Sequence, residues 1–137
     1  DVGSRESLDA LGEILSATKE PRLIKAAIYA VEDHDGREAA EILHETAISV
    51  SDEELAKAAA YALEDVLEED DPALLLDIYR KSKFPSVRKV ALNAIEDMAD
   101  AASVRDLGKI LNEEKDPKMR RIIVRVLGET RSDDAVP

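Results

Sequence analysis

Apolar residues recur every three or four positions along most of the chain, which is the spacing of an amphipathic helix. The clearest stripe follows Pro85 and has apolar residues at i, i+3, i+4, i+7 and i+8: Val87, Val90, Ala91, Ala94 and Ile95. The same spacing after Pro21 predicts another stripe that faces the core: Leu23, Ala26, Ala27, Ala30 and Val31. The pattern therefore predicts a series of helices that each bury one face.

One nine-residue phrase occurs twice, as KAAIYAVED at 25–33 and, 32 residues later, as KAAAYALED at 57–65. Weaker copies follow at the same interval, KVALNAIED at 89–97 and RIIVRVLGE at 121–129. A second helical pattern lies between the copies, and its leucines recur at the same period: Leu11, Leu43, Leu75 and Leu107. Each 32-residue unit is therefore predicted to contain two helices.

The start of each second helix is marked in the sequence by proline or by an acid: Pro21, Glu53, Pro85 and Pro117. Proline in the first turn costs little, because that N–H has no partner within the helix. Asp52 and Asp116 stand one residue earlier, where a helix N-cap belongs. We place the units within one domain, 1–137, at about 4–33, 36–65, 70–98 and 101–129, and assign 130–137 to the start of a truncated further repeat.

Neither helix of a unit can bury its stripe alone, but units stacked side by side bury all the stripes in one continuous core. The phrases FPSVRKVALNAIED and DPKMRRIIVRVLGE resemble the second helix of HEAT repeats, and the short period resembles the HEAT-like repeats of phycobilisome lyases. The first two units depart from the pattern, since Ile24 and Ala56 stand where Arg88 and Arg120 carry the repeat arginine. We therefore predict an all-α, right-handed α-solenoid of about four two-helix HEAT-like repeats.

The outward positions of the second helices form columns when the units are stacked. A step of about 100° per residue turns one basic column away from the core: Lys25, Lys57, Lys89 and Arg121. A neighbouring column holds Tyr29, Tyr61, Asn93 and Arg125, and a third column is acidic, with Glu32, Glu64 and Glu96. The resemblance implies that second helices line the concave face, so the basic and tyrosine columns are predicted to bind a partner protein. The other interpretation is a soluble surface duplicated with the repeat, its lysines balanced by its glutamates.

Charge and composition exclude several classes of function. The net charge of −12 arises entirely in residues 1–69, which hold 18 acidic and 6 basic residues, and such a chain is expected to repel nucleic acid. There is no cysteine, no apolar run long enough for a membrane span and no visible signal peptide, so we expect a cytoplasmic protein that binds neither nucleic acid nor membrane.

No motif in the sequence indicates catalysis, a cofactor or a metal. The His44-Glu45 pair is similar to the iron-binding pairs of deoxyhypusine hydroxylase, but that pattern needs several pairs, and His34 has only adjacent acids. We therefore predict no enzyme activity, no metal and no cofactor. The predicted function is a protein–protein interaction scaffold or adaptor; the alternative is a bilin lyase or a lyase-like tetrapyrrole chaperone subunit.

The last predicted helix is apolar on more than one face: Met119, Ile122, Ile123, Val124, Val126 and Leu127. An end repeat normally carries a polar outer side. An uncovered apolar flank is typical of a contact site, so this end is expected either to continue into a longer solenoid or to bury itself against another copy or a partner. We predict weak self-association through residues 119–127.

Overall fold

The computed structural model describes residues 2–67, 72–98 and 101–129, and in these ranges the chain forms eight helices and no strands. The helices come in consecutive pairs: α1 (Val2–Ala17) with α2 (Pro21–Glu32), α3 (Arg37–Ser49) with α4 (Glu53–Val66), α5 (Ala73–Lys81) with α6 (Pro85–Met98), and α7 (Ala101–Glu113) with α8 (Pro117–Glu129). The predicted all-α fold is confirmed. The proposed start of a further repeat, at 130–137, lies outside the described residues.

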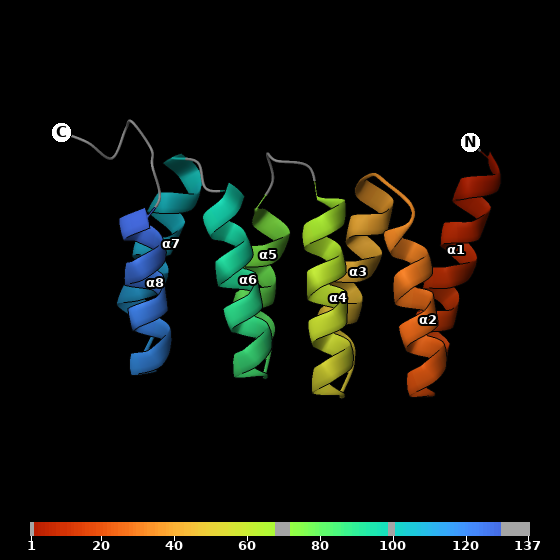
Figure 1. Cartoon of the computed structure of the whole chain (residues 1–137), viewed down its shortest axis with the longest axis horizontal. Coiled ribbons are helices and arrows are strands. Elements are labelled where there is room, and N and C mark those ends of the chain that lie inside the picture. The colour runs from red at the N-terminus through yellow and green to blue at the C-terminus, as the bar shows by residue number, and fades with distance from the viewer. Residues whose placement is uncertain (1, 68–71, 99–100, 130–137) are drawn as a thin grey trace.

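The eight helices form two layers, with the even-numbered helices in front and the odd-numbered helices behind them (Figure 1). Each even helix packs against the next one, α2 on α4, α4 on α6 and α6 on α8, and the odd helices α1, α3 and α5 also pack in succession. Every unit therefore contacts its neighbours along a line, which is the arrangement of an α-solenoid.

The first turns of the even helices follow the local signals in the sequence. Pro21, Pro85 and Pro117 are the first residues of α2, α6 and α8. The Asp52 carboxylate accepts a hydrogen bond from the Leu55 N–H at 3.1 Å, and Asp116 accepts one from the Lys118 N–H at 2.9 Å. Both predicted N-caps are thus confirmed, and each satisfies an amide that has no partner within its helix.

Many of the buried side chains of the even helices are small. Ala56, Ala59 and Ala60 of α4 have no exposed surface, and Ala91 and Ala94 of α6 are at most 1% exposed. The distance between packed helices depends on the side chains at their contact, so alanine lets the even helices approach closely. The larger leucines of the odd helices fill the space between the layers, with Leu43, Leu75 and Leu107 fully buried.

The predicted apolar stripe of the first unit is partly wrong. Leu23 is 41% exposed and Ala26 is also exposed, whereas the buried side chains of α2 are Ile24, Ala27, Ile28 and Val31. The equivalents of Leu23 in later units are all buried: Leu55, Val87 and Met119. Those units pack against a preceding unit, whereas the main contacts of α2 are with α1, α3 and α4. The buried face of α2 is therefore rotated toward the following repeat.

The repeat arginine of the third unit joins three elements. The Arg88 Nε donates to the backbone carbonyl of Tyr79 at 3.1 Å, and its guanidinium lies over the Tyr79 ring, 4.5 Å from the centroid. Arg88 also forms an ion pair with Glu114, which accepts a second hydrogen bond from the Tyr79 hydroxyl. The cluster ties α5 and α6 to the loop that follows α7.

The charges of this cluster are set by their surroundings. Burial and the hydrogen bond to Glu114 raise the pKa of Tyr79 well above its usual range, so the hydroxyl keeps its proton. Burial alone would raise the pKa of Glu114, but hydrogen bonds from Tyr79 and from the Asp116 amide, together with the charge of Arg88, hold it below its usual range. The carboxylate therefore stays ionised beside the arginine.

Arg120 repeats part of this arrangement one unit later. Its guanidinium donates to the backbone carbonyls of Leu111 and Glu114, and Leu111 is the equivalent of Tyr79. In both cases the arginine of the second helix caps the last turn of the first helix, where carbonyls lack partners within the helix. Because Ile24 and Ala56 occupy the equivalent positions, the first two units are held together without this bond.

We predict that Ala59→Leu lowers the free energy of unfolding by about 1–3 kcal/mol, because extra methylene groups do not fit the close contacts of α4. Urea titration followed by circular dichroism measures the change. The matched control is Ala26→Leu on the exposed side of α2, which should change stability by less than about 0.5 kcal/mol because both residues favour helices. Equal stability of the Ala59 variant and the unmodified protein would contradict the close packing of the even layer.

Candidate partner-binding face

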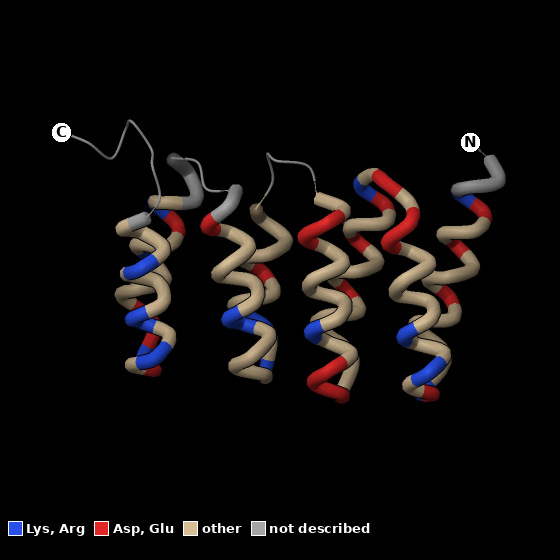
Figure 2. The backbone as a smooth tube through the Cα atoms, in the orientation of Figure 1, with Lys and Arg blue, Asp and Glu red and all other residues tan. Residues whose placement is uncertain are grey.

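The structure places the predicted columns together on the outward face of the even helices. Four of the basic side chains are exposed: Lys25, Lys89, Arg121 and Arg125. Tyr29 and Tyr61 are 50% and 52% exposed, while Lys57 and Asn93 are half-buried. Figure 2 shows basic positions on α2, α4, α6 and α8 that together form a band across the front layer. We call these eight residues the basic band.

The N-terminal half of the band combines cations with aromatic rings. The Lys25 ammonium lies over the Tyr29 ring, 5.9 Å from its centroid, and the Lys57 ammonium is 3.9 Å from a carboxylate oxygen of Glu54. Both contacts join residues of the same helix, so they do not hold neighbouring repeats together. The exposed tyrosine rings offer rigid apolar surface with a polar hydroxyl at the edge, the combination that is frequent at protein interfaces.

The C-terminal half of the band has a polar link in place of the tyrosines. The Arg125 Nη2 donates to the Asn93 Oδ1 at 2.7 Å, and its Nη1 lies 3.4 Å from the Glu96 Oε2. Arg125 is on α8, whereas Asn93 and Glu96 are on α6. These side chains thus connect the outward positions of the third and fourth units. The contacts described above for the first two units each lie within a single helix.

A hollow of about 450 Å³ lies between α6 and α8 within the basic band. Its rim carries four cations, Lys89, Lys118, Arg121 and Arg125, and its apolar lining includes Pro85, Met119 and Ile122. Sequence reasoning missed Lys118, because its equivalents Arg22, Glu54 and Ser86 show no repeated type. The hollow combines positive charge with apolar surface, so it suits an anionic group attached to an apolar side chain.

Carboxylates border the basic band at the C-terminal ends of the even helices. Glu32 of α2 and Asp65 of α4 are hydrogen-bonded to each other, and this bond, with burial and the charges of Asp65 and Asp33, raises the pKa of Glu32 to about 6. A negative charge in the last turn of a helix is also unfavourable to the helix dipole. Near neutral pH this edge therefore reduces the stability of the contact between the first two units.

The odd helices carry a separate contact that involves one of the two histidines. The His44 Nε2 lies 2.6 Å from the Asp77 Oδ2, which joins α3 to α5, and Lys81 lies 3.2 Å from the same oxygen. Burial alone would raise the pKa of Asp77, but hydrogen bonds from His44 and Lys81 lower it below its usual value. Throughout residues 2–67, 72–98 and 101–129, no three histidine, cysteine or acidic side chains are grouped as metal ligands would be.

Residues 72–137 match the family model of HEAT repeats. The chain is a HEAT-like repeat protein. The match covers the two units with the repeat arginines Arg88 and Arg120, while the first two units share the 32-residue period and the two-helix architecture. No curated protein and no solved structure matches the chain. None of the helices that the structure describes in this HEAT-like repeat protein is both long and apolar enough to cross a membrane.

We predict that Glu32→Gln makes the HEAT-like repeat protein more stable near pH 7. Since the folded-state pKa of Glu32 is raised from 4.5 to about 6, its proton stabilises the fold below pH 4.5, and this contribution is lost as the pH rises through about 6. Gln cannot ionise, so the variant should lack this loss and gain up to about 1 kcal/mol at pH 7, after allowing for solvent screening.

Thermal unfolding at several pH values between 4 and 8 measures the effect. The control is Glu6→Gln, which removes one exposed acid of α1 and should leave the pH dependence of the melting temperature unchanged. The melting temperature of the Glu32 variant could instead fall in parallel with that of the unmodified protein from pH 4.5 to 6. This result would show that Glu32 and Asp65 share no proton.

Proposed function

We propose that this HEAT-like repeat protein is a non-catalytic scaffold, and that its basic band binds an acidic or mixed-charge segment of another protein. HEAT repeats commonly mediate contacts between proteins, and the match to this family supports the general role. The observation that carries the specific proposal is the basic column on all four second helices, Lys25, Lys57, Lys89 and Arg121, in a chain with a net charge of −12.

The packing of the even layer supports binding on this face. The second helices pack against one another in succession, α2 on α4, α4 on α6 and α6 on α8, so their outward faces form one continuous surface. A surface made by successive second helices suits an extended or helical segment that contacts several repeats in turn. The partner would then meet the same chemistry at each step along the band.

Two observations favour a binding role over a merely soluble duplicated surface. The acids that border the band lie in the last turns of α2, α4 and α6, where they oppose the helix dipole and do not stabilise the helices. In addition, Tyr29 and Tyr61 expose half of their surface, although polar side chains would serve solubility better. Both features are understandable if charge and aromatic surface at these positions are used to recognise a partner.

The expected energetics are those of a small number of anchor residues. Tyrosine and arginine are common binding hot spots. Truncating such a side chain weakens binding of the partner by more than about 1 kcal/mol. Surrounding lysines would add mainly to the rate of association and to its dependence on salt. Tyr29, Tyr61 and Arg121 are therefore the expected anchors, with Lys25, Lys57 and Lys89 as the electrostatic part.

We predict that the double variant Tyr61→Ala with Lys57→Glu weakens binding of an acidic peptide by more than about 1 kcal/mol, roughly fivefold or more. The probe is a fluorescein-labelled peptide of glutamate and leucine at helical spacing, and fluorescence anisotropy gives its affinity. The control is Lys109→Glu, which reverses one exposed lysine of α7 in the odd layer and should change affinity less than twofold. A larger loss from the α7 control than from the double variant would show that the basic band is not the binding face.

We also propose that the C-terminal end self-associates weakly through residues 119–127. Val124 is 56% exposed and Ile122 and Leu127 are half-buried, whereas Met119, Ile123 and Val126 are buried within the stack. The equivalents of Val124 in earlier units, Ile28, Ala60 and Leu92, have no exposed surface. Val124 thus occupies a position that a further helix pair covers elsewhere in the solenoid.

The expected result is a concentration-dependent sedimentation coefficient for the unmodified protein that Val124→Glu abolishes without loss of helical circular dichroism. Burying a glutamate in an apolar contact is unfavourable, so one substitution suffices. Arg105→Glu on α7 serves as a control for the change in charge. A protein that sediments as a monomer at millimolar concentration would rule out this contact.

A further inference from the structure

The odd layer contains a cleft of about 1370 Å³ between the first two units, lined mainly by α1 and α3, with the first turns of α2 and α4 at one end. The residues of α1 that line it run from Leu8 to Ala17, about 14 Å along the helix. Clefts that hold small molecules typically measure about 300–1,000 Å³, so this one has room for a peptide segment. None of the eight residues of the basic band lines it.

Apolar side chains line the cleft and connect it to the core. Leu15, Ile42 and Val50 are half-buried there, and Leu8, Ile24 and Leu55 lie beneath as part of the buried core. The two helices come close where Gly12 faces Ile42, since a Cβ atom on this glycine would lie 3.5 Å from the Ile42 side chain. An occupant of the cleft would therefore meet apolar surface that is only partly covered by the protein itself.

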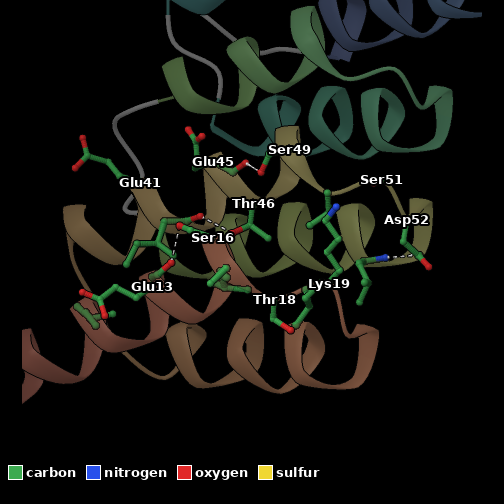
Figure 3. A pocket seen from close by; sticks show the side chains of 18 of the residues that line it. Glu13, Ser16, Thr18, Lys19, Glu41, Glu45, Thr46, Ser49, Ser51 and Asp52 are labelled. Carbon is green, nitrogen blue, oxygen red and sulfur yellow. Dashed lines mark hydrogen bonds between the residues drawn. The ribbon is translucent and has the colours of Figure 1, made fainter.

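The rim of the cleft is acidic. Six carboxylate residues line it, Asp9, Glu13, Glu38, Glu41, Glu45 and Asp52, against one cation, Lys19. Figure 3 shows Glu13 on one side of the pocket and Glu41 and Glu45 on the other. Across the mouth, Glu38 is hydrogen-bonded to Asp9, which raises the pKa of Glu38 above its usual value. The rim therefore concentrates negative charge that the protein itself compensates only in part.

Three of the five hydroxyl groups that line the cleft already donate hydrogen bonds within the protein. Ser16 donates to the carbonyl of Gly12, Thr46 to that of Ile42 and Ser49 to that of Glu45, at 2.9, 2.8 and 2.7 Å (Figure 3). Each hydroxyl proton is thus engaged within its own helix, and the oxygen lone pairs remain as acceptors. These acceptor oxygens and the carboxylates together favour an occupant that carries N–H donors and positive charge.

We propose that the cleft between α1 and α3 binds a basic amphipathic segment of a partner protein, whose leucine-like side chains pack on Leu15, Ile42 and Val50 while its lysines or arginines face the acidic rim. The charge complementarity argues for a basic occupant, and the apolar lining argues for a peptide rather than a simple cation such as a polyamine. The site is in the odd layer and does not rest on the function proposed for the basic band.

The experiment measures anisotropy of a fluorescein-labelled lysine–leucine peptide of about 14 residues, roughly 21 Å as a helix. Glu13→Gln with Glu45→Gln should weaken its binding about fivefold or more, because both carboxylates line the rim. The matched control, Glu6→Gln with Glu20→Gln, removes the same charge from exposed positions outside the cleft and should change affinity less than twofold. Replacing the leucines of the peptide by glutamine should also weaken binding.

Equal losses in the two double variants would overturn the proposal, since attraction would then depend on net charge alone. Equal affinity of the leucine-free peptide, or no saturable binding at all, would overturn it too. The variant Tyr61→Ala with Lys57→Glu should leave the affinity for this peptide unchanged. The proposal for the basic band and the proposal for the cleft can therefore be disproved separately. A photoreactive leucine analogue in the peptide should cross-link to α1 or α3, and exclusive labelling of even helices would contradict the assignment.

Discussion

Contact between neighbouring repeats is the interaction on which the whole structure depends. A pair of helices with one apolar stripe each has no interior of its own, so each unit is folded only when the next unit covers it. Alanine at the contacts of the even helices, as at Ala59 and Ala91, brings successive units close enough to do this. The same stacking in register lines up equivalent residues, and it turns a repeated sequence into rows of charge on the surface.

The two layers present opposite surfaces to the solvent. The even layer displays cations and tyrosines with acids at the helix ends, whereas the odd layer opens between α1 and α3 into a cleft with an acidic rim. Interactions between the repeats also change along the chain. Paired carboxylates connect the first two units at Glu32 and Asp65. The last two units are held by Arg88, which bonds to the Glu114 carboxylate and to the Tyr79 carbonyl. A scaffold of this kind could engage two different segments at once, one on each layer.

The period and the helical spacing made the fold predictable, because both depend on local residue order. The outward placement of Tyr29 and Tyr61 also followed from the helical step alone. Leu23 was wrongly predicted to lie in the core. Its burial depends on whether another unit packs against that face of α2, and the residues of α2 alone do not indicate this. The contacts of Tyr79 with Glu114 and the cleft between α1 and α3 involve separate helices whose spacing no local pattern specifies, so they became visible only in the structure.

The first helix, α1, is held less firmly than the helices near the centre of the stack. Among the residues of α1 whose side chains are described, Leu8 is the single buried one, whereas seven side chains of α4 are buried. Amide protons in α1 should consequently exchange with deuterium sooner than those of α4, since local opening separates α1 without disturbing the central repeats. Local opening of this single helix would therefore change the width of the acidic cleft, because α1 forms one of its walls.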